Sequence, residues 1–397
     1  MAFPLSADIL VLKQTMSESP PTVSLCLIAK DERVDLPRCL ASVQPHVDEM
    51  VVIDTGSGDD TPELAAQLGA RVEYFTWCDD FAAARNYALA QVRTDWVLVL
   101  DADEELVVAA VNWRDALTQP LLAYSLPLTD AGNPHDLTPL WVPRLFRQHP
   151  DLRYVGNYHE RLFYRGGALP MTRTATLSDL GLIHYGYSPE RLQDKELHRN
   201  IPMLERLRHR QGLSFLLLYS LAGMYTNTGQ LDEAQSCYAE AGDRLLPHLL
   251  TGEPPTEFGY VPSLLFNLGV QALQAQDLET AQLLAQRGLE WCPTFPPLIY
   301  FAGATVRALG FRRGAIAYFE YCLDLGKTGQ FYRDEPFERR LMTISPAYDL
   351  GCLHLELGHE QAALSAFQLA LEFDPDCTPA QIEVARLRTA SAQRTME

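Results

Sequence analysis

Several patterns that mark common classes of protein are missing from this sequence of 397 residues. No apolar run reaches the length of about 18 residues that a transmembrane helix needs, so no transmembrane segment is predicted. Residues 1–21 lack an apolar stretch behind a basic front, and they predict a loose, disordered tail instead of a signal peptide. We therefore expect a cytoplasmic protein.

Basic clusters and cysteine pairs are also missing. The formal net charge is −19 and no dense run of Lys and Arg occurs, which argues against nucleic-acid and anionic-lipid partners. The eight cysteines are scattered singly without a C-x-x-C, so neither a disulfide framework nor a zinc site is predicted. Most of them should be buried thiols in a reducing compartment.

Glycine-rich nucleotide-binding loops are a third absence. No G-x-G-x-x-G follows the first predicted strand and no G-x-x-x-x-G-K occurs, which argues against dinucleotide and P-loop sites. The segment LIAKDERVDL also has no glycine, unlike the basic loop expected of a nucleotidyltransferase. A diphosphate bound here would need a divalent cation or a guanidinium as its partner.

Strand and helix patterns alternate over residues 22–100. Short apolar runs predict strands at residues 22–29, 49–53, 71–75 and 96–100, and the segments between them predict helices at residues 35–43, 61–69 and 81–91. Thr61 is expected to cap the second of these helices. Such alternation predicts right-handed crossovers and a parallel sheet.

Acidic residues follow three of the four predicted strands. They are Asp31 and Glu32, then Asp54, then Asp101 with Asp103. Because the carboxyl ends of parallel strands meet at one edge of a sheet, we expect these side chains at the same edge, exposed and contributing little to folding. Two carboxylates one residue apart can both bind a hard divalent cation, although a solvated acidic turn has the same pattern.

Four linked motifs carry a family resemblance. SLCLIAKDE, VVIDTGSGDDT, DDFAAARNYAL and WVLVLDADEEL, in this order and spacing, resemble the inverting family 2 glycosyltransferases of the GT-A fold, in particular bacterial members that transfer sugars to lipopolysaccharide core or to peptides. The resemblance covers about residues 22–110. It implies an α/β, Rossmann-like GT-A domain of the nucleotide-diphospho-sugar transferase type, which we expect to extend over residues 22–212.

The resemblance also implies roles for the residues of the acidic edge. Asp54 would contact the base of the nucleotide, and Glu32 and Arg85 would help line its pocket. Asp101 and Asp103 would form the D-x-D motif that serves the ribose and a metal, Mn²⁺ or Mg²⁺, bound to the diphosphate. From the residues alone, Arg85 could equally be a surface residue of its helix.

Residues 121–128 and 139–146 predict a hairpin packed against the parallel sheet. The stretch over residues 153–162 then interleaves aromatic and charged side chains, which suits a sugar acceptor. Inversion needs a general base to take the acceptor's proton, and Glu160 is our candidate. The alternatives are a salt bridge of Glu160 with Arg161 or Arg153, and a base at Glu104, Glu105 or Asp136.

His184 ends a further predicted strand. On sequence alone it is a hydrogen-bonded core residue, whereas the family resemblance implies that it completes the metal site of Asp101 and Asp103. A helix starting at residue 188 is predicted next, with one apolar face made of Leu192, Leu197, Ile201, Leu204 and Leu207.

Residues 213–397 repeat a pair of helices. Aligning Ala234, Ala281, Ala315 and Ala363 gives steps of 47, 34 and 48, so the middle step equals the tetratricopeptide period and the outer two fit that period plus insertions. These units resemble tetratricopeptide repeats and predict an all-α repeat domain over residues 213–397. Such a domain could bind the acceptor or a protein partner, or it could only brace the first domain or form a homodimer.

Together these features predict an enzyme. We expect a metal-dependent, inverting glycosyltransferase that uses a nucleoside-diphosphate sugar, in the first instance a UDP sugar, and a glycan, lipopolysaccharide-core or peptide acceptor. The alternative is a catalytically silent glycosyltransferase-like domain on a repeat scaffold that binds proteins. The intact D-x-D carboxylates argue against that alternative.

Overall fold

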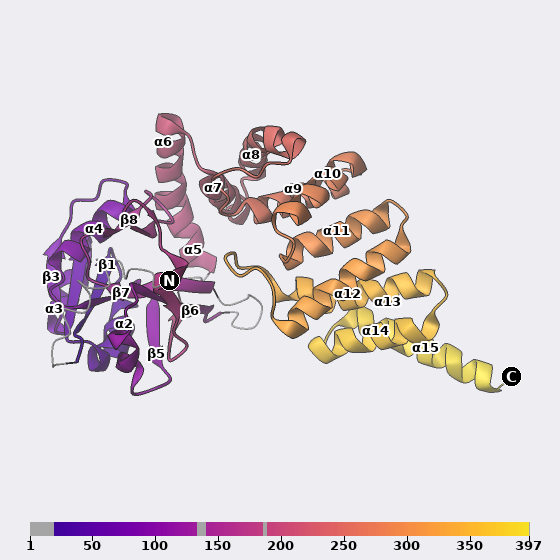
Figure 1. Cartoon of the computed structure of the whole chain (residues 1–397), viewed down its shortest axis with the longest axis horizontal. Helices are drawn as coiled ribbons and strands as arrows, with labels where there is room; N and C mark the ends of the chain where they lie inside the picture. Colours follow the sequence, from indigo (N-terminus) through magenta and orange to yellow (C-terminus); the bar gives the residue numbers. More distant parts are fainter. Residues whose placement is uncertain (1–19, 133–139, 186–188, 397) are drawn as a thin grey trace, which may run out of the picture. The chain divides into compact units, whose positions relative to one another are not determined.

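The structure is a computed structural model that describes residues 20–132, 140–185 and 189–396. The described residues form two compact units, one made of residues 20–132, 140–185 and 189–192 and the other of residues 193–396 (Figure 1). The expected domain boundary after residue 212 remains a prediction. Most of the expected tail over residues 1–21, and the alternative base Asp136, lie outside the described residues.

A mixed sheet forms the centre of the first unit, with the strand order β3-β2-β1-β4-β7-β6-β12-β5 and β11 beside β6. The strands are β1 Val23–Ala29, β2 Glu49–Asp54, β3 Arg71–Tyr74, β4 Trp96–Val99, β5 Glu104–Val108, β6 Ala123–Asp130, β7 Leu140–Arg147, β11 Thr174–Thr176 and β12 Leu180–His184. A small antiparallel sheet consists of β8 Leu152–Val155, β9 Arg161–Tyr164 and β10 Gly167–Ala168.

The first four strands are parallel, as predicted. Every residue of β4 is buried, which explains its unbroken apolar run. The connecting helices are α2 Leu36–Val43, α3 Thr61–Gln67 and α4 Phe81–Gln91. Asp80 caps α4 by accepting from the backbone N–H of Ala83 at 2.9 Å. The prediction for α3 was wrong by one position, because Thr61 is its first helical residue and Asp60 holds the cap position.

The predicted hairpin exists, but its expected placement was wrong. β6 and β7 pair antiparallel, and β7 also pairs antiparallel with β4, so the hairpin extends the parallel strands within one sheet and does not pack on their face. Leu145 lies opposite Leu98 in this register. Arg144 therefore reaches the carboxyl end of β4.

The helical stretch after β12 has an interruption that the sequence pattern did not indicate. α5 Pro189–Lys195 and α6 Ile201–Gln211 flank a π-helical turn at Glu196–Asn200. An extra residue in one turn rotates the face that follows it. Leu197, which was expected on the apolar face, lies within this turn and is 38% exposed, whereas Ile201, Leu204 and Leu207 after the turn are buried as predicted.

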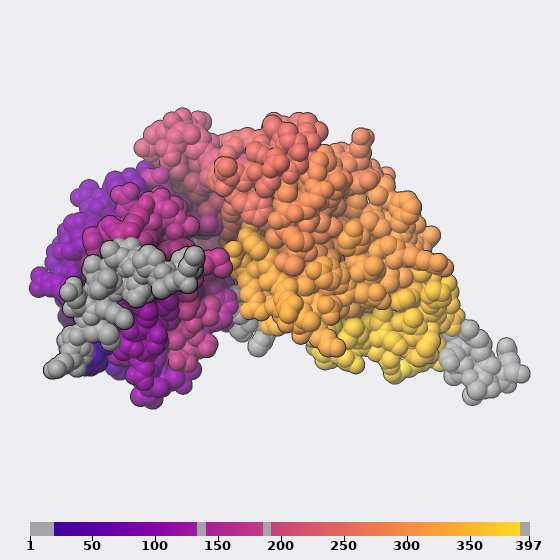
Figure 2. All heavy atoms as spheres, viewed as in Figure 1, coloured from indigo at the N-terminus to yellow at the C-terminus, as the bar shows by residue number. Residues whose placement is uncertain are grey.

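The second unit is a succession of helix pairs. Its helices are α6, described above, then α7 Phe215–Asn227, α8 Leu231–Thr251, α9 Val261–Gln274, α10 Leu278–Trp291, α11 Pro296–Ala308, α12 Arg312–Thr328, α13 Ile344–Glu356, α14 Glu360–Phe373 and α15 Thr378–Met396. The four aligned alanines are all buried, each at the fourth position of α8, α10, α12 or α14. In Figure 2 the colours of these helices follow one another in sequence order, as expected of stacked repeats.

The repeats contain two inserted segments, one between α8 and α9 and one between α12 and α13. Each supplies a carboxylate to the start of another helix. Glu257 accepts from the backbone N–H of Phe215 at 3.1 Å, at the start of α7. Glu335 accepts from the N–H groups of Tyr260 at 2.8 Å and Ser263 at 3.1 Å, at the start of α9. The Ser263 hydroxyl donates to the same carboxylate at 2.6 Å. Burial raises the pKa of Glu335 to about 7, although these hydrogen bonds lower it.

All eight cysteines are free thiols; Cys78 is exposed, and Cys26, Cys39, Cys237, Cys292 and Cys322 are buried. Among the residues described, we find no helix that combines the length and the apolar character needed to cross a membrane.

Candidate functional site

The D-x-D carboxylates lie in a tight turn between β4 and β5. The N–H of Glu104 donates to the carbonyl of Asp101 at 3.0 Å, and the Glu104 carboxylate accepts from the N–H of Asp101 at 2.9 Å. These two hydrogen bonds close the turn on itself. Asp103 and Glu104 are buried, which corrects the expectation of exposed carboxylates at this edge. The Asp101 side chain is about one-third exposed, at 34%.

Two arginines hold the two carboxylate oxygens of Asp101. Arg85, from α4, donates through Nη2 to Oδ1 at 2.7 Å, and Arg144, from β7, donates through Nη2 to Oδ2 at 2.9 Å. Arg144 also donates to Glu104 Oε1 at 2.7 Å. Because Arg85 is buried, its alternative assignment as a surface helix residue was wrong.

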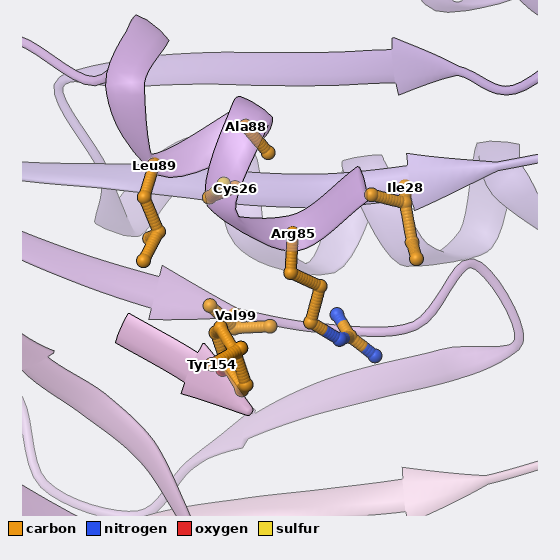
Figure 3. Close-up of a pocket in the computed structure, with 7 residues that line it drawn as sticks. All are labelled: Cys26, Ile28, Arg85, Ala88, Leu89, Val99 and Tyr154. Carbon is orange, nitrogen blue, oxygen red and sulfur yellow. The ribbon is translucent and has the colours of Figure 1, made fainter. Parts of the chain in front are cut away.

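Glu160 joins this network through Arg85, whose Nε forms a short ion pair with Glu160 Oε1. The predicted alternative was a salt bridge with Arg153 or Arg161, and the partner is Arg85 instead. Figure 3 shows the Arg85 side chain extending from α4 past Val99 and Tyr154, with Cys26 and Ile28 on the neighbouring strand; the same residues line a small apolar pocket around its stem. That packing fixes the direction in which the guanidinium points.

Charge balance explains the protonation of this cluster. Burial, together with the negative charge of Asp101, raises the pKa of Glu104 to about 7, although the positive charge of Arg144 lowers it. Asp101 is also affected by burial, but the two guanidinium groups outweigh it and hold its pKa well below the usual range. Arg85 and Arg144 thus face three carboxyl groups, those of Asp101, Glu104 and Glu160, and the raised pKa of Glu104 reduces the excess of negative charge.

His184 lies beside Asp103, with Nε2 at 3.5 Å from Oδ1. Burial lowers the pKa of His184, but the hydrogen bond and the charge of Asp103 outweigh burial and raise it overall. The N–H of Tyr185 donates to the Asp103 carbonyl at 2.9 Å, and its hydroxyl donates to Glu105 at 2.7 Å. The end of β12 is thus fastened to the D-x-D turn.

Two of the three predicted metal ligands fit a divalent cation. Asp103 and His184 are adjacent and offer an oxygen and an imidazole nitrogen. Asp101 does not fit as placed, because both of its oxygens accept from guanidinium groups. Over residues 20–132, 140–185 and 189–396 no three His, Cys, Asp or Glu side chains are grouped closely enough to hold a metal. A ligand role for Asp101 stays a prediction that requires an arginine to move.

The residues predicted to bind the base lie at the ends of β1 and β2. Asp54 is buried and accepts from the N–H groups of Gly56 at 3.0 Å and Ser57 at 3.2 Å, so it organises the turn that follows β2. The neighbouring Glu32 donates its N–H to Thr61 Oγ1 at 2.9 Å. The structure therefore brings Asp101, Arg85 and Glu160 together beside the Asp103–His184 pair. Glu32 follows β1 and Asp54 ends β2, and Asp31 joins the loops after these two strands through its hydrogen bonds with Ser57 and Gly58.

Arg144 and Tyr185 are site residues that the sequence reasoning missed. Arg144 interrupts the apolar run WVPRLF of β7, and a charge inside a strand pattern is a signal that could have identified it. Tyr185 directly follows His184, but its sequence position gives no sign that it reaches Glu105. The alternative base Glu105 itself binds the Tyr185 hydroxyl, and Glu104 is fully buried.

Comparison with known protein families gives two matches. Residues 24–108 match the family described as Glycosyl transferase family 2, and residues 345–377 match the family described as Tetratricopeptide repeat. The first match contains the D-x-D turn and Arg85. The second covers α13 and α14.

Curated relatives match over different lengths. A TPR repeat-containing protein of Synechococcus elongatus is 38% identical over 269 residues, 65% of this chain and 64% of that protein. An uncharacterized glycosyltransferase of Rickettsia felis is 39% identical over 84 residues, 21% of this chain and 29% of that protein. The SPbeta prophage-derived glycosyltransferase SunS of Bacillus subtilis is 25% identical over 195 residues, 47% of this chain and 45% of that protein.

The chain covers less than two thirds of the length of each of these relatives. The predicted family and fold class are confirmed by the family matches and by the mixed sheet followed by helix pairs. This chain therefore carries a family 2 glycosyltransferase domain followed by a region of tetratricopeptide repeats.

Proposed function

We propose that this chain is an inverting glycosyltransferase. Its donor would be a nucleoside-diphosphate sugar, with a UDP sugar as the favoured candidate. Its acceptor would be a glycan, lipopolysaccharide core or peptide. The observation that supports the proposal is the set of contacts Asp101–Arg85–Glu160 beside the Asp103–His184 pair. Asp101, Asp103 and Arg85 lie within the residues that match the family 2 glycosyltransferases. Relatives named as glycosyltransferases support it.

Glu160 is the residue proposed to take the acceptor's proton. Its Oε1 is paired with Arg85, so Oε2 would accept the proton as the acceptor attacks the anomeric carbon. Arg85 fixes the direction of this carboxylate because Asp101 and the packed stem hold the guanidinium. The Arg85 guanidinium is also proposed to stabilise the negative charge that develops on the leaving diphosphate.

Asp103 and His184 are the residues proposed to hold Mn²⁺ or Mg²⁺. A bound divalent cation supplies positive charge that stabilises the leaving diphosphate. Tyr185 keeps Asp103 in place through its backbone N–H. Asp54 and Glu32 are proposed to form the nucleotide side, with Asp54 acting through the turn that it organises.

The proposal is tested by a thermal-shift screen of nucleoside diphosphates and their sugars, with and without Mn²⁺. A ligand that binds only the native state raises the unfolding temperature by mass action. We expect the largest shift for one nucleotide with its sugar, and a smaller shift when a chelator is added. The absence of any shift across the whole set of nucleotides and sugars would contradict the proposal.

A second candidate is a catalytically silent domain on a protein-binding repeat scaffold. The observation that favours it is that both oxygens of Asp101 are occupied by guanidinium groups. The two candidates differ in the same screen, since a silent domain that has lost its donor site gives no nucleotide-dependent shift. In either case, the repeats are proposed to bind a protein or acceptor, or to pair with a second copy.

A further inference from the structure

An aromatic cluster lies next to the proposed base. Trp77 and Phe81 meet edge to face with ring centroids 4.7 Å apart, and Phe81 and Tyr158 meet in the same way at 5.8 Å. The three rings come from the loop after β3, the first turn of α4 and the loop between β8 and β9. All three residues are partly exposed, so the cluster presents aromatic surface to solvent. Trp77 and Phe81 lie outside the 153–162 stretch that the sequence assigned to the acceptor.

Hydrogen bonds between the two loops hold this cluster in place. The N–H of Phe81 donates to the carbonyl of Asn157 at 2.9 Å, and the Asn157 side chain donates to Asp80 at 3.0 Å. The indole N–H of Trp77 donates to Asp79 at 3.1 Å. Such cross-links fix the relative position of the three rings before any ligand arrives.

Backbone strain marks the same two loops. Asp79 has φ of 58° and His159 has φ of 51°, both in the left-handed region that residues other than glycine seldom occupy. Such a strained backbone conformation persists where the surrounding structure imposes it. Asp79 lies between Trp77 and Phe81 in the sequence, and His159 directly follows Tyr158, so both strained residues belong to the loops that carry the cluster.

The cluster is also close to the network of Glu160. Phe81 and Arg85 are four residues apart on α4, so their side chains lie on the same face, about one helical turn from each other. Tyr158 precedes Glu160 by two residues, and Arg85 pairs with Glu160. A ring bound against Phe81 and Tyr158 would therefore lie within reach of the Glu160 carboxylate.

We propose that Phe81 and Tyr158, with Trp77 behind them, form the subsite for a sugar ring of the acceptor. The apolar C–H face of a pyranose packs on aromatic rings, while its hydroxyls project sideways to polar groups. This inference rests on the proposed function, because Glu160 takes a proton from the acceptor. A nucleobase is the less favoured occupant, since the residues implied for the base, Asp54 and Glu32, organise the loops after β2 and β1.

The test is saturation-transfer NMR on the full chain, with methyl β-glucopyranoside and N-acetylglucosamine as probes and with UDP plus Mn²⁺ in a separate sample. The variants are Phe81→Leu and Tyr158→Leu, which keep apolar volume but remove the aromatic face. Tyr74→Leu is the matched control, because Tyr74 is an aromatic residue that is 66% exposed on β3. Thermal midpoints establish that each variant is folded, and if Phe81→Leu fails to fold, Tyr158→Leu carries the comparison.

We expect the glycosides to receive saturation on one face of the ring, and their affinity to fall about two- to tenfold in both variants but not in the control. UDP binding should be unchanged. The inference is overturned if the glycosides receive no saturation, or if they bind the variants as well as the parent chain. It is also overturned if the variants weaken UDP, which would assign the cluster to the nucleobase. Failure of the proposed function would show separately, as absent UDP binding in the parent chain.

Discussion

Arg144 donates at 2.7 Å to the carboxylate of Glu104, a side chain with no exposed surface. Removing one member of a buried ion pair leaves the other uncompensated. We therefore expect Arg144→Met to destabilise the chain by about 3 kcal/mol, and the added change Glu104→Gln to restore a part of that loss. Urea unfolding of the two single variants and the double variant measures this coupling. If the losses of unfolding free energy in the two single variants add up to the loss in the double variant, the Arg144–Glu104 interaction contributes nothing to stability.

Asp101 and Asp103 should respond differently to truncation. Asp101→Ala removes the shared partner of Arg144 and of the buried Arg85, and we expect a loss of about 3–5 kcal/mol in the free energy of unfolding. Asp103→Ala leaves both arginine partners of Asp101 in place and should cost less, while it removes the carboxylate beside His184 and abolishes the Mn²⁺-dependent part of donor binding. Urea unfolding combined with the nucleotide thermal-shift screen checks both. Equal stabilities of the two variants would contradict the role assigned to Asp101.

Glu160→Gln should lower turnover by about 10²-fold or more while leaving donor affinity nearly unchanged, as expected for a lost general base. Arg85 keeps Asp101 as a partner in this variant, so the fold should survive. Glu105→Gln is measured in parallel, because Glu105 is an alternative base; it should keep wild-type turnover, since its carboxylate already accepts from the Tyr185 hydroxyl. The measurement is steady-state kinetics over a range of pH. Loss of a general base changes the pH dependence of turnover, whereas loss of a carboxylate with a structural role does not. Wild-type turnover in Glu160→Gln would move the search for the base to Glu105 or Asp136.

Glu335 should make the repeats less stable as the pH rises. Its folded pKa is about 7 and lies above the reference value of 4.5, so the folded state holds the proton more tightly. The stability that this group contributes is complete below pH 4.5 and is lost as the pH rises through about 7. Relative to Glu335→Gln, the parent chain should lose about 1–3 kcal/mol between these two values.

Chemical denaturation followed by far-ultraviolet circular dichroism at several pH values measures this difference. Glu338→Gln is the matched control, since Glu338 lies in the same segment but its side chain is 53% exposed and pairs with Arg340. A constant difference between the parent chain and Glu335→Gln across this range would show that Glu335 keeps an ordinary pKa.

A chain that ends after residue 192 should bind donor as the full chain does, because all the proposed donor residues precede that point.

A chain that ends after residue 211 should be less soluble than the chain that ends after residue 192. It would keep α6 but lose its partners in α7 and α8, among them the contacts Glu205–Tyr225 and Arg208–Glu240. The apolar face of Ile201, Leu204 and Leu207 would then be exposed. UDP affinity tests the prediction on donor binding, and size-exclusion chromatography of the two chains tests the prediction on solubility. Equal solubility would show that α6 does not need to pack against α7 and α8.

The candidate site was predicted in part because donor motifs and strand ends coincide in the sequence. Asp101, Asp103 and Arg85 belong to segments whose strand or helix is evident from local patterns, and parallel pairing brings such strand ends to one edge. The same reasoning could not identify the partner of Glu160, because Arg85 is 75 residues away along the chain. It also missed Arg144, whose position depends on the pairing of β7 with β4.

The sequence by itself determined the alternation of strands and helices, the apolar character of β4 and the spacing of the four buried alanines, because periodicity and burial are recorded in neighbouring residues. Only the tertiary structure decided which charges neutralise one another. The hairpin joins the sheet edge to edge, and that choice brings Arg144 to Asp101 and Glu104. A register between distant strands is set by side-chain packing across the sheet, which no local pattern specifies.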